Sequence, residues 1–312
     1  MIEITKYQPE YKELWNNFIK KSKNGTFMLD RDYMDYHSDR FQDNSLMFFN
    51  EKQELIAVIP ANITDNVLFS HGGLTYGGVV SDKKMTVQKM LDIFDNLIIY
   101  LKKENIKKFV YKRIPWVYYT YPSDEDFYAL FRYGASLIRC DISTAIYLPE
   151  RIKFNERRKR NIKKAIKSDL KFKRTEDFEQ YITILSEVLK IHHNTKPVHT
   201  ADELRKLAQT FPDNIKLYAA YNSDNMLAGV LIFETETTAH AQYIVNSEEG
   251  RNCGALDLVF DKLINEIYTN KKYFDFGIST ENQGRYLNEG LISQKQEFGG
   301  RGVVYEFYEL IV

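Results

Sequence analysis

Thiols are scarce in this sequence, because Cys140 and Cys253 are the only cysteines among its 312 residues. Two cysteines are too few for a disulfide framework or for a zinc site built from thiolates. Long apolar runs are also lacking. The first residues contain no hydrophobic segment typical of a secretory signal, and no stretch approaches the roughly 18 apolar residues of a membrane span. We therefore expect a cytoplasmic protein without a membrane span.

The sequence has no excess of either charge, since 43 Lys and Arg residues balance 43 Asp and Glu residues. A protein that neutralises many phosphates normally carries a basic excess, so this balance argues against a dedicated nucleic-acid-binding protein. Two enzyme motifs are missing as well. No G-x-S-x-G sequence accompanies the glycines after His71, and no G-x-x-x-x-G-K-[ST] loop occurs. These absences argue against a serine hydrolase and an NTPase.

The composition is that of a globular protein, with 44% hydrophobic and 14% aromatic residues. Helical and strand-like periodicities alternate along the chain, and three consecutive strands are predicted at residues 215–221, 227–235 and 238–245. The two halves share one order of predicted elements, although no residue-level repeat connects them. We predict an α/β (α+β) fold of two similar domains, residues 1–149 and 150–312, each with a mixed, mostly antiparallel sheet flanked by helices.

The most informative segment follows the strand that ends at Val245. A loop over residues 246–253 is predicted to lead into a helix that starts near Ala255. Free backbone N–H groups and the positive end of the helix dipole can bind a pyrophosphate at such a position. The order Arg251-x-x-Gly254 resembles the acyl-CoA loop of the GNAT superfamily of N-acetyltransferases, which reads Q/R-x-x-G-x-G/A. Leu256 departs from that pattern, so a plain strand-to-helix turn remains the alternative.

This resemblance implies an acyl-CoA donor, with acetyl-CoA expected first. It also implies which residues contact the donor: Ile244, Val245, Arg251, Asn252, Cys253, Gly254 and Ala255. Gln242 and Tyr243, on the preceding strand, are expected near the reacting centre, although a regular strand would point only one of them into the cleft.

A basic helix joins the two halves and carries the sequence R-x-K-R-N-I-x-K-A from Arg157 to Ala165. Together with the duplicated order of elements, it is similar to the FemABX peptidyltransferase group and its acetyltransferase relatives. The resemblance implies that the second half binds the donor and the first half helps to bind the acceptor. Fem enzymes use aminoacyl-tRNA and usually carry a long helical arm. No coiled-coil insertion occurs here, which favours the acetyltransferase relatives.

The acceptor expected from this similarity is an amino sugar, a sugar nucleotide or a cell-envelope precursor. Two alternatives stay open. One is a Fem-like aminoacyl-tRNA-dependent transferase, in which the basic helix would bind tRNA rather than form a solvated face. The other is a non-catalytic binding module that retains the fold. The oligomeric state is not predicted.

Candidate catalytic residues come from two further segments. His199 precedes a helix with a predicted capping box of Thr200 and Glu203. His192 and His193 lie close by in sequence, but no carboxylate has ligand spacing, so no metal is predicted.

Polar residues follow the apolar strand at residues 273–278, at the sheet edge where α/β proteins bind ligands. Glu281 is predicted as general base, provided that burial raises its pKa, with His199 as the second candidate. Five residues are predicted to bind substrate, with capping and loop hydrogen bonds as the alternative role: Asp275, Ser279, Thr280, Asn288 and Lys295.

Overall fold

The computed structural model describes residues 2–193 and 197–312, and these form two compact units. The first unit consists of Met1–Ile142, Thr280–Tyr286 and Val303–Val312. The second unit consists of Ser143–Ser279 and Leu287–Gly302. The chain passes from the first unit to the second within strand β8 (Ser136–Tyr147). No described helix is long and apolar enough to cross a membrane.

The first unit begins with a small antiparallel sheet in the order β1-β2-β3-β6. A second set of strands follows the order β4-β5-β7-β16-β8, in which β5 and β7 are parallel. The strands of the unit other than β8 have these bounds: β1 (Glu3–Lys6), β2 (Leu46–Phe49), β3 (Leu55–Ile59), β4 (Asn62–Thr64), β5 (Val67–Phe69), β6 (Val80–Ser81), β7 (Lys108–Lys112), β14 (Thr280–Glu281) and β16 (Arg301–Ile311). Strand β14 pairs with β15 (Tyr286–Leu287) in a separate two-stranded sheet. Its α-helices are α1 (Lys12–Lys21), α2 (Arg31–Met34), α3 (Val87–Lys103) and α4 (Glu125–Arg132).

Helix α3 forms the centre of the first unit's core. Its sequence places Met90, Phe94, Leu97 and Leu101 at intervals of three and four residues, so one face is apolar. That face is buried against β7 and α4 in one cluster. Thr86 caps the helix by accepting a hydrogen bond from the backbone N–H of Lys89.

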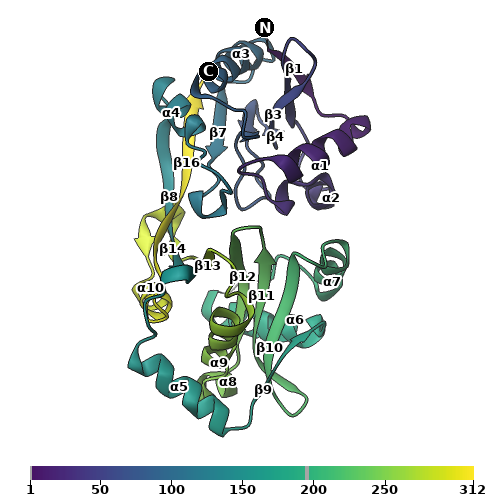
Figure 1. Ribbon diagram of the computed structural model, residues 1–312. Helices are drawn as coiled ribbons and strands as arrows, with labels where there is room; N and C mark the ends of the chain where they lie inside the picture. Colours follow the sequence, from purple (N-terminus) through teal and green to yellow (C-terminus); the bar gives the residue numbers. More distant parts are fainter. Residues whose placement is uncertain (1, 194–196) are drawn as a thin grey trace. The chain divides into compact units, whose positions relative to one another are not determined.

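The second unit is built on strands in the order β8-β13-β12-β11-β10-β9 (Figure 1). All neighbours are antiparallel except β12 and β13. The remaining strands are β9 (Lys171–Thr175), β10 (Ile215–Asn222), β11 (Asn225–Glu234), β12 (Thr238–Asn246) and β13 (Tyr273–Ile278). The helices are α5 (Glu156–Lys167), α6 (Phe178–His193), α7 (Ala201–Thr210), α8 (Glu248–Cys253), α9 (Ala255–Lys262) with a π-helical extension Leu263–Ile267, and α10 (Glu289–Gln296).

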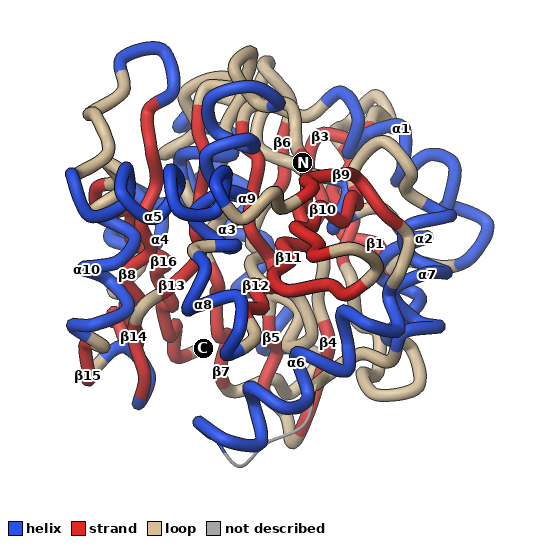
Figure 2. The backbone as a smooth tube through the Cα atoms, turned by 90° about the horizontal axis from the view of Figure 1, so that it is seen from below, coloured by secondary structure: helices blue, strands red, loops and turns tan. Residues whose placement is uncertain are grey.

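Alternation along β11 explains how helices cover both faces of this sheet. Ala228, Val230 and Ile232 are buried in one cluster with residues of α9. Gly229 points to the other face, where a Cβ would press against the ring of Tyr181 from α6. Figure 2 draws strands β10, β11 and β12 in red and helices α6 and α9 in blue. The predicted class, mixed and mostly antiparallel sheets flanked by helices, is confirmed.

One predicted loop is wrong. Residues 246–253 were expected to be irregular, but residues 248–253 form helix α8. The helix begins because Ser247 accepts a hydrogen bond from the N–H of Gly250, and Glu248 and Glu249 occupy its first turn. Gly250 is required by packing and not by a loop, since a Cβ there would collide with the carbonyl of Leu227.

Candidate active site

Strands β12 and β13 run side by side for only three residue pairs, of which His240–Asp275 is the last. Each strand then bulges. Between β12 and β11, Tyr243 pairs with Leu231 and Ala241 with Ile232, so Gln242 is an extra residue. In β13 the register with β8 shifts between Asp275 and Ile278. These two bulges explain why the parallel strands part at this point.

The separation leaves one edge of β12 open. From Gln242 to Asn246 the strand has β11 on one side, and on its other side no described strand pairs with it. Backbone N–H and C=O groups along such an edge can bond to an extended ligand. The parted strands therefore form a place where a chain with amide groups can lie.

A buried polar cluster sits at the last shared pair. The fully buried Asp275 carboxylate accepts hydrogen bonds from Ser143 Oγ at 2.5 Å and from the N–H of Gly277 at 3.1 Å. Its second oxygen lies 2.9 Å from Nδ1 of His240. Gly277 has a φ of 77°, which suits glycine at a bulge. Both carboxylate oxygens of Asp275 thus bond to groups of the protein. This fits the alternative role given above, structural hydrogen bonding, better than substrate binding.

Lys295 fixes the end of β13. Its ammonium donates to the carbonyls of Gly277 and Ile278, both at 2.7 Å. Burial lowers the pKa of Lys295 to about 8, although the negative charge of Asp275 acts in the opposite direction. Helix α10 therefore holds the bulged end of β13 through one buried cation.

Three predicted catalytic residues of the second unit come together. Nδ1 of the buried His199 lies 3.0 Å from the hydroxyl of Tyr243. Burial raises the pKa of the Tyr243 phenol, and a hydrogen bond with the Gln242 side chain opposes part of the rise. The side-chain oxygen of Gln242 is buried without a hydrogen-bond partner among the described residues. The bulge accounts for this grouping, because neighbours on a regular strand point to opposite faces.

The capping box after His199 is confirmed, and it fixes the position of that residue. Thr200 N–H donates to Glu203 at 2.6 Å, and Glu203 N–H donates to the Thr200 hydroxyl at 3.2 Å. The side chains of His192 and His193 lie outside the described residues. Among the described side chains, no group of three or more His, Cys, Asp or Glu is arranged for a metal.

The predicted donor segment is built from α8, Gly254 and the start of α9. Gly254 has a φ of 81°, and a Cβ there would collide with the carbonyl oxygen of Asn161 in α5. Next to it, Asp257 pairs with the buried Arg158 at 2.9 Å. Close packing of α5 against α9 thus explains the glycine without a ligand. Arg251 and Asn252 are exposed and accessible to a ligand.

Cys253 does not have the environment of a reactive thiol. Burial raises its pKa, although the N–H of Ala255 acts in the opposite direction. Ile244 is half-buried, and Val245 is buried on β12. The roles of these residues and of the rest of the donor segment stay predictions.

The remaining predicted residues are divided between the units. In the second unit, Asn288 caps α10 by accepting from Leu291 N–H at 3.0 Å, and the hydroxyl of Ser279 is buried. In the first unit, Thr280 donates to Asp141 at 2.8 Å. Glu281 also belongs to the first unit, and its side chain is exposed. The prediction of Glu281 as general base was conditional on burial, and the structure shows this carboxylate exposed.

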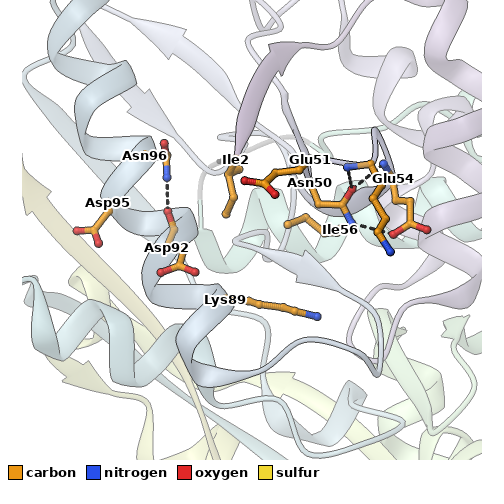
Figure 3. Close-up of a pocket in the computed structure, with 10 residues that line it drawn as sticks. Ile2, Asn50, Glu51, Glu54, Ile56, Lys89, Asp92, Asp95 and Asn96 are labelled. Carbon is orange, nitrogen blue, oxygen red and sulfur yellow. Dashed lines mark hydrogen bonds between the residues drawn. The ribbon is translucent and has the colours of Figure 1, made fainter.

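A separate cavity of about 460 Å³ lies in the first unit, between α3 and the turn after β2 (Figure 3). Four of its lining residues are acidic: Glu51, Glu54, Asp92 and Asp95. Asn50 and Asn96 bond within this lining, to Glu54 and to the backbone of Asp92. None of the predicted site residues lines this cavity.

Residues 153–286 match the family model described as the acetyltransferase (GNAT) domain. The matched range contains the parted strands, the His199–Tyr243 pair and the α8–α9 segment. This part of the chain is therefore similar to a GNAT acetyltransferase domain. Acyl transfer is the chemistry of that domain, and the predicted GNAT resemblance is confirmed. No curated protein matches the sequence.

Solved structures extend the similarity over the whole chain. FemX shares 10% identity and a TM-score of 0.69, covering 99% of this chain and 97% of its own. The C-terminal domain of a putative lysylphosphatidylglycerol synthetase from Agrobacterium fabrum shares 11% identity and a TM-score of 0.61, over 96% and 91%. A tandem GNAT protein from the clavulanic acid biosynthesis pathway shares 10% identity and a TM-score of 0.51, over 99% and 98%. At these identities the likeness concerns the fold, and it confirms the Fem-related similarity.

The sequence analysis missed two members of the polar cluster beside the parted strands β12 and β13. Ser143 and His240 reach Asp275 from positions 132 and 35 residues away in sequence. Both residues lie in strands whose sequences are typical of buried core strands. A buried polar residue at an inward position of such a strand is the signal that would have found them.

Proposed function

We propose that this protein transfers an acyl group from acyl-CoA to an amine or hydroxyl of an amino sugar, a sugar nucleotide or a cell-envelope precursor. The observation that carries the proposal is the open edge of β12, which starts beside the last β12–β13 pair and leads to α8. The pantetheine arm of CoA is an extended chain with two amide groups, and it suits such an edge. Arg251 and Asn252 are exposed at the far end, where the phosphates would lie.

In this mechanism the acceptor attacks the thioester carbonyl carbon, the new C–N or C–O bond forms, and the C–S bond breaks. His199 takes the acceptor's proton, and the phenol of Tyr243 gives its proton to the departing sulfur. His199 then passes a proton to the Tyr243 oxygen along the hydrogen bond between the two side chains, which restores both groups. The raised pKa of Tyr243 supports this role, because it keeps the phenol protonated near neutral pH.

The remaining rate acceleration comes from positioning, because the enzyme holds the amine or hydroxyl next to the thioester and so replaces a bimolecular encounter. The buried cluster around Asp275 and the cation of Lys295 hold the bulged end of β13 in place. We assign these two residues to positioning and not to contact with the acceptor. The acceptor class rests on the Fem-related fold alone.

Calorimetric titration with acetyl-CoA tests the donor. Arg251→Glu places a negative charge beside the proposed phosphate position and should weaken binding roughly tenfold or more. Arg174→Glu is the matched control, because Arg174 is also exposed and also bonds a backbone carbonyl, that of Pro212. Equal affinity of the two variants, or no binding by the wild type, would contradict the assignment. Binding of aminoacyl-tRNA without acetyl-CoA would favour the Fem-like reaction.

A further inference from the structure

The chain concentrates positive charge in one segment of the second unit. Residues 151–173 contain 11 Lys and Arg residues and two Asp and Glu residues, whereas the whole chain is neutral. Most of this charge lies on α5. The buried side of that helix consists of Arg158, Ile162 and Ala165, so it is already packed against the protein.

Four cations line the outward side of α5: Arg160, Lys163, Lys164 and Lys167. They are spaced three and four residues apart, so like charges are neighbours, which destabilises an isolated helix. None of the four forms an ion pair with another described side chain. Arg157 and Lys159 add two more cations near the start of the helix, where the helix dipole disfavours positive charge. An anionic partner would relieve both costs.

A groove of about 460 Å³ runs beside this helix. Ile152, Phe154 and Ile162 contribute apolar surface to it, and Asp261 is its single acidic residue. Its cationic residues are these: Arg151, Lys153, Lys159 and Lys163. Two isoleucines of the same segment are exposed to solvent, Ile152 by 48% and Ile166 by 60%. The surface thus combines cations with aliphatic side chains.

We propose that the groove and the outward side of α5 dock on an anionic phospholipid surface. Lysines attract the phosphates of such a surface, and exposed isoleucines insert among the acyl chains. A single-stranded RNA partner is less well matched, because such RNA binds through aromatic stacking platforms. The aromatic ring of this groove, Phe154, already packs edge-on against Phe298 at 5.2 Å. The proposal does not depend on the acyl donor.

Co-sedimentation with vesicles tests this docking. The full chain should bind vesicles that contain about one-third phosphatidylglycerol and should not bind pure phosphatidylcholine, and salt should weaken the binding. Lys163→Glu with Lys164→Glu should reduce binding at least about tenfold. Lys102→Glu with Lys103→Glu is the matched control, since these adjacent lysines are exposed near the end of α3. Equal loss in both pairs would overturn the proposal.

A second pair of variants separates lipid from nucleic acid. Ile166→Ser should weaken vesicle binding a few-fold, whereas Ile99→Ser, at an equally exposed position of α3, should not. Circular dichroism checks that each variant is folded. A parallel titration uses tRNA and a short single-stranded RNA. The lipid proposal is wrong if the wild type does not bind the vesicles and Lys163→Glu with Lys164→Glu lowers the affinity for RNA. The surface would then bind nucleic acid.

Discussion

The imidazole of His199 and the phenol of Tyr243 are joined by a hydrogen bond of 3.0 Å between Nδ1 and the hydroxyl oxygen. One residue precedes helix α7, and the other follows a bulge in β12, 44 residues later. The capping box holds the first, and the bulge turns the second. In the proposed mechanism His199 accepts the acceptor's proton, and the raised pKa of Tyr243 keeps its phenol protonated near neutral pH.

Removing the phenol hydroxyl tests the acid role. Tyr243→Phe should lower kcat roughly 100-fold, because the departing sulfur loses its proton donor. Acetyl-CoA affinity should stay within a few-fold. Tyr221→Phe is the matched control, since its hydroxyl also bonds a side chain, Thr175 at 3.1 Å. Steady-state kinetics and calorimetry of both variants check the prediction, and equal kcat values in the two would contradict it.

Turnover of two variants distinguishes His199 from Glu281 as the general base. His199→Ala should lower kcat roughly 100-fold or more, because the acceptor then attacks with its proton still bound. Glu281→Gln should keep turnover within a few-fold, since the exposed carboxylate lacks the burial that would adapt it to this task. Initial-rate measurements at saturating donor separate the two. The reverse result would return the base role to Glu281.

The buried cation of Lys295 gives stability a pH dependence. Its pKa in the folded protein is about 8, below the ordinary 10.5. Between these values the unfolded chain binds one more proton at this site, so the free energy of unfolding rises with pH. Lys295→Met removes this contribution and leaves two carbonyls without their donor, at a cost of about 1–3 kcal/mol.

Urea unfolding of the wild type and Lys295→Met at pH 7 to 10 measures the effect. The stability difference between them should grow as pH rises from about 8 towards 10. Lys112, which burial also brings to a pKa of about 8, is present in both proteins and cancels out. A difference that is constant with pH would show that the pKa of Lys295 is not lowered.

Glycine at position 254 is predicted to be a packing requirement. Gly254→Ala forces a side chain into a left-handed conformation and against the carbonyl of Asn161, which should cost at least about 2 kcal/mol. Gly290→Ala is the control, because a Cβ there would meet only Asn288 Oδ1, at an ordinary contact distance of 3.8 Å, and should change stability by no more than about 1 kcal/mol. Thermal and urea unfolding measure both. Equal stability of the two variants would contradict the close packing of α5 on α9.

Local patterns predicted the elements well where periodicity was clear. The strand at residues 273–278 has the predicted bounds, and the basic segment around Ile162 is a helix. The segment after Val245 failed because Gly250 was interpreted as a loop signal, although Ser247 and two glutamates mark a helix start. A glycine that permits close packing looks the same in sequence as one that permits a turn.

The candidate site was predictable only in part. His199 and Tyr243 were both named from their local motifs, but their contact depends on the bulge at Gln242, which no local pattern indicates. The partners of Asp275 lie on the neighbouring strands β8 and β12, and the register of strand pairing brings them together. That register cannot be deduced from any short segment of sequence. Arg158 likewise appeared to be one cation among many, yet it is buried with Asp257.

Single-turnover transfer of a radiolabelled acetyl group tests the central claim most directly. The wild type is mixed with labelled acetyl-CoA and with amino-sugar or sugar-nucleotide acceptors, and the labelled product and free CoA thiol are followed together. The account predicts that both appear at equal rates, only when an acceptor is present, and roughly 100-fold more slowly in Tyr243→Phe. Unchanged acetyl-CoA with every acceptor, while aminoacyl-tRNA is consumed under the same conditions, would contradict the account.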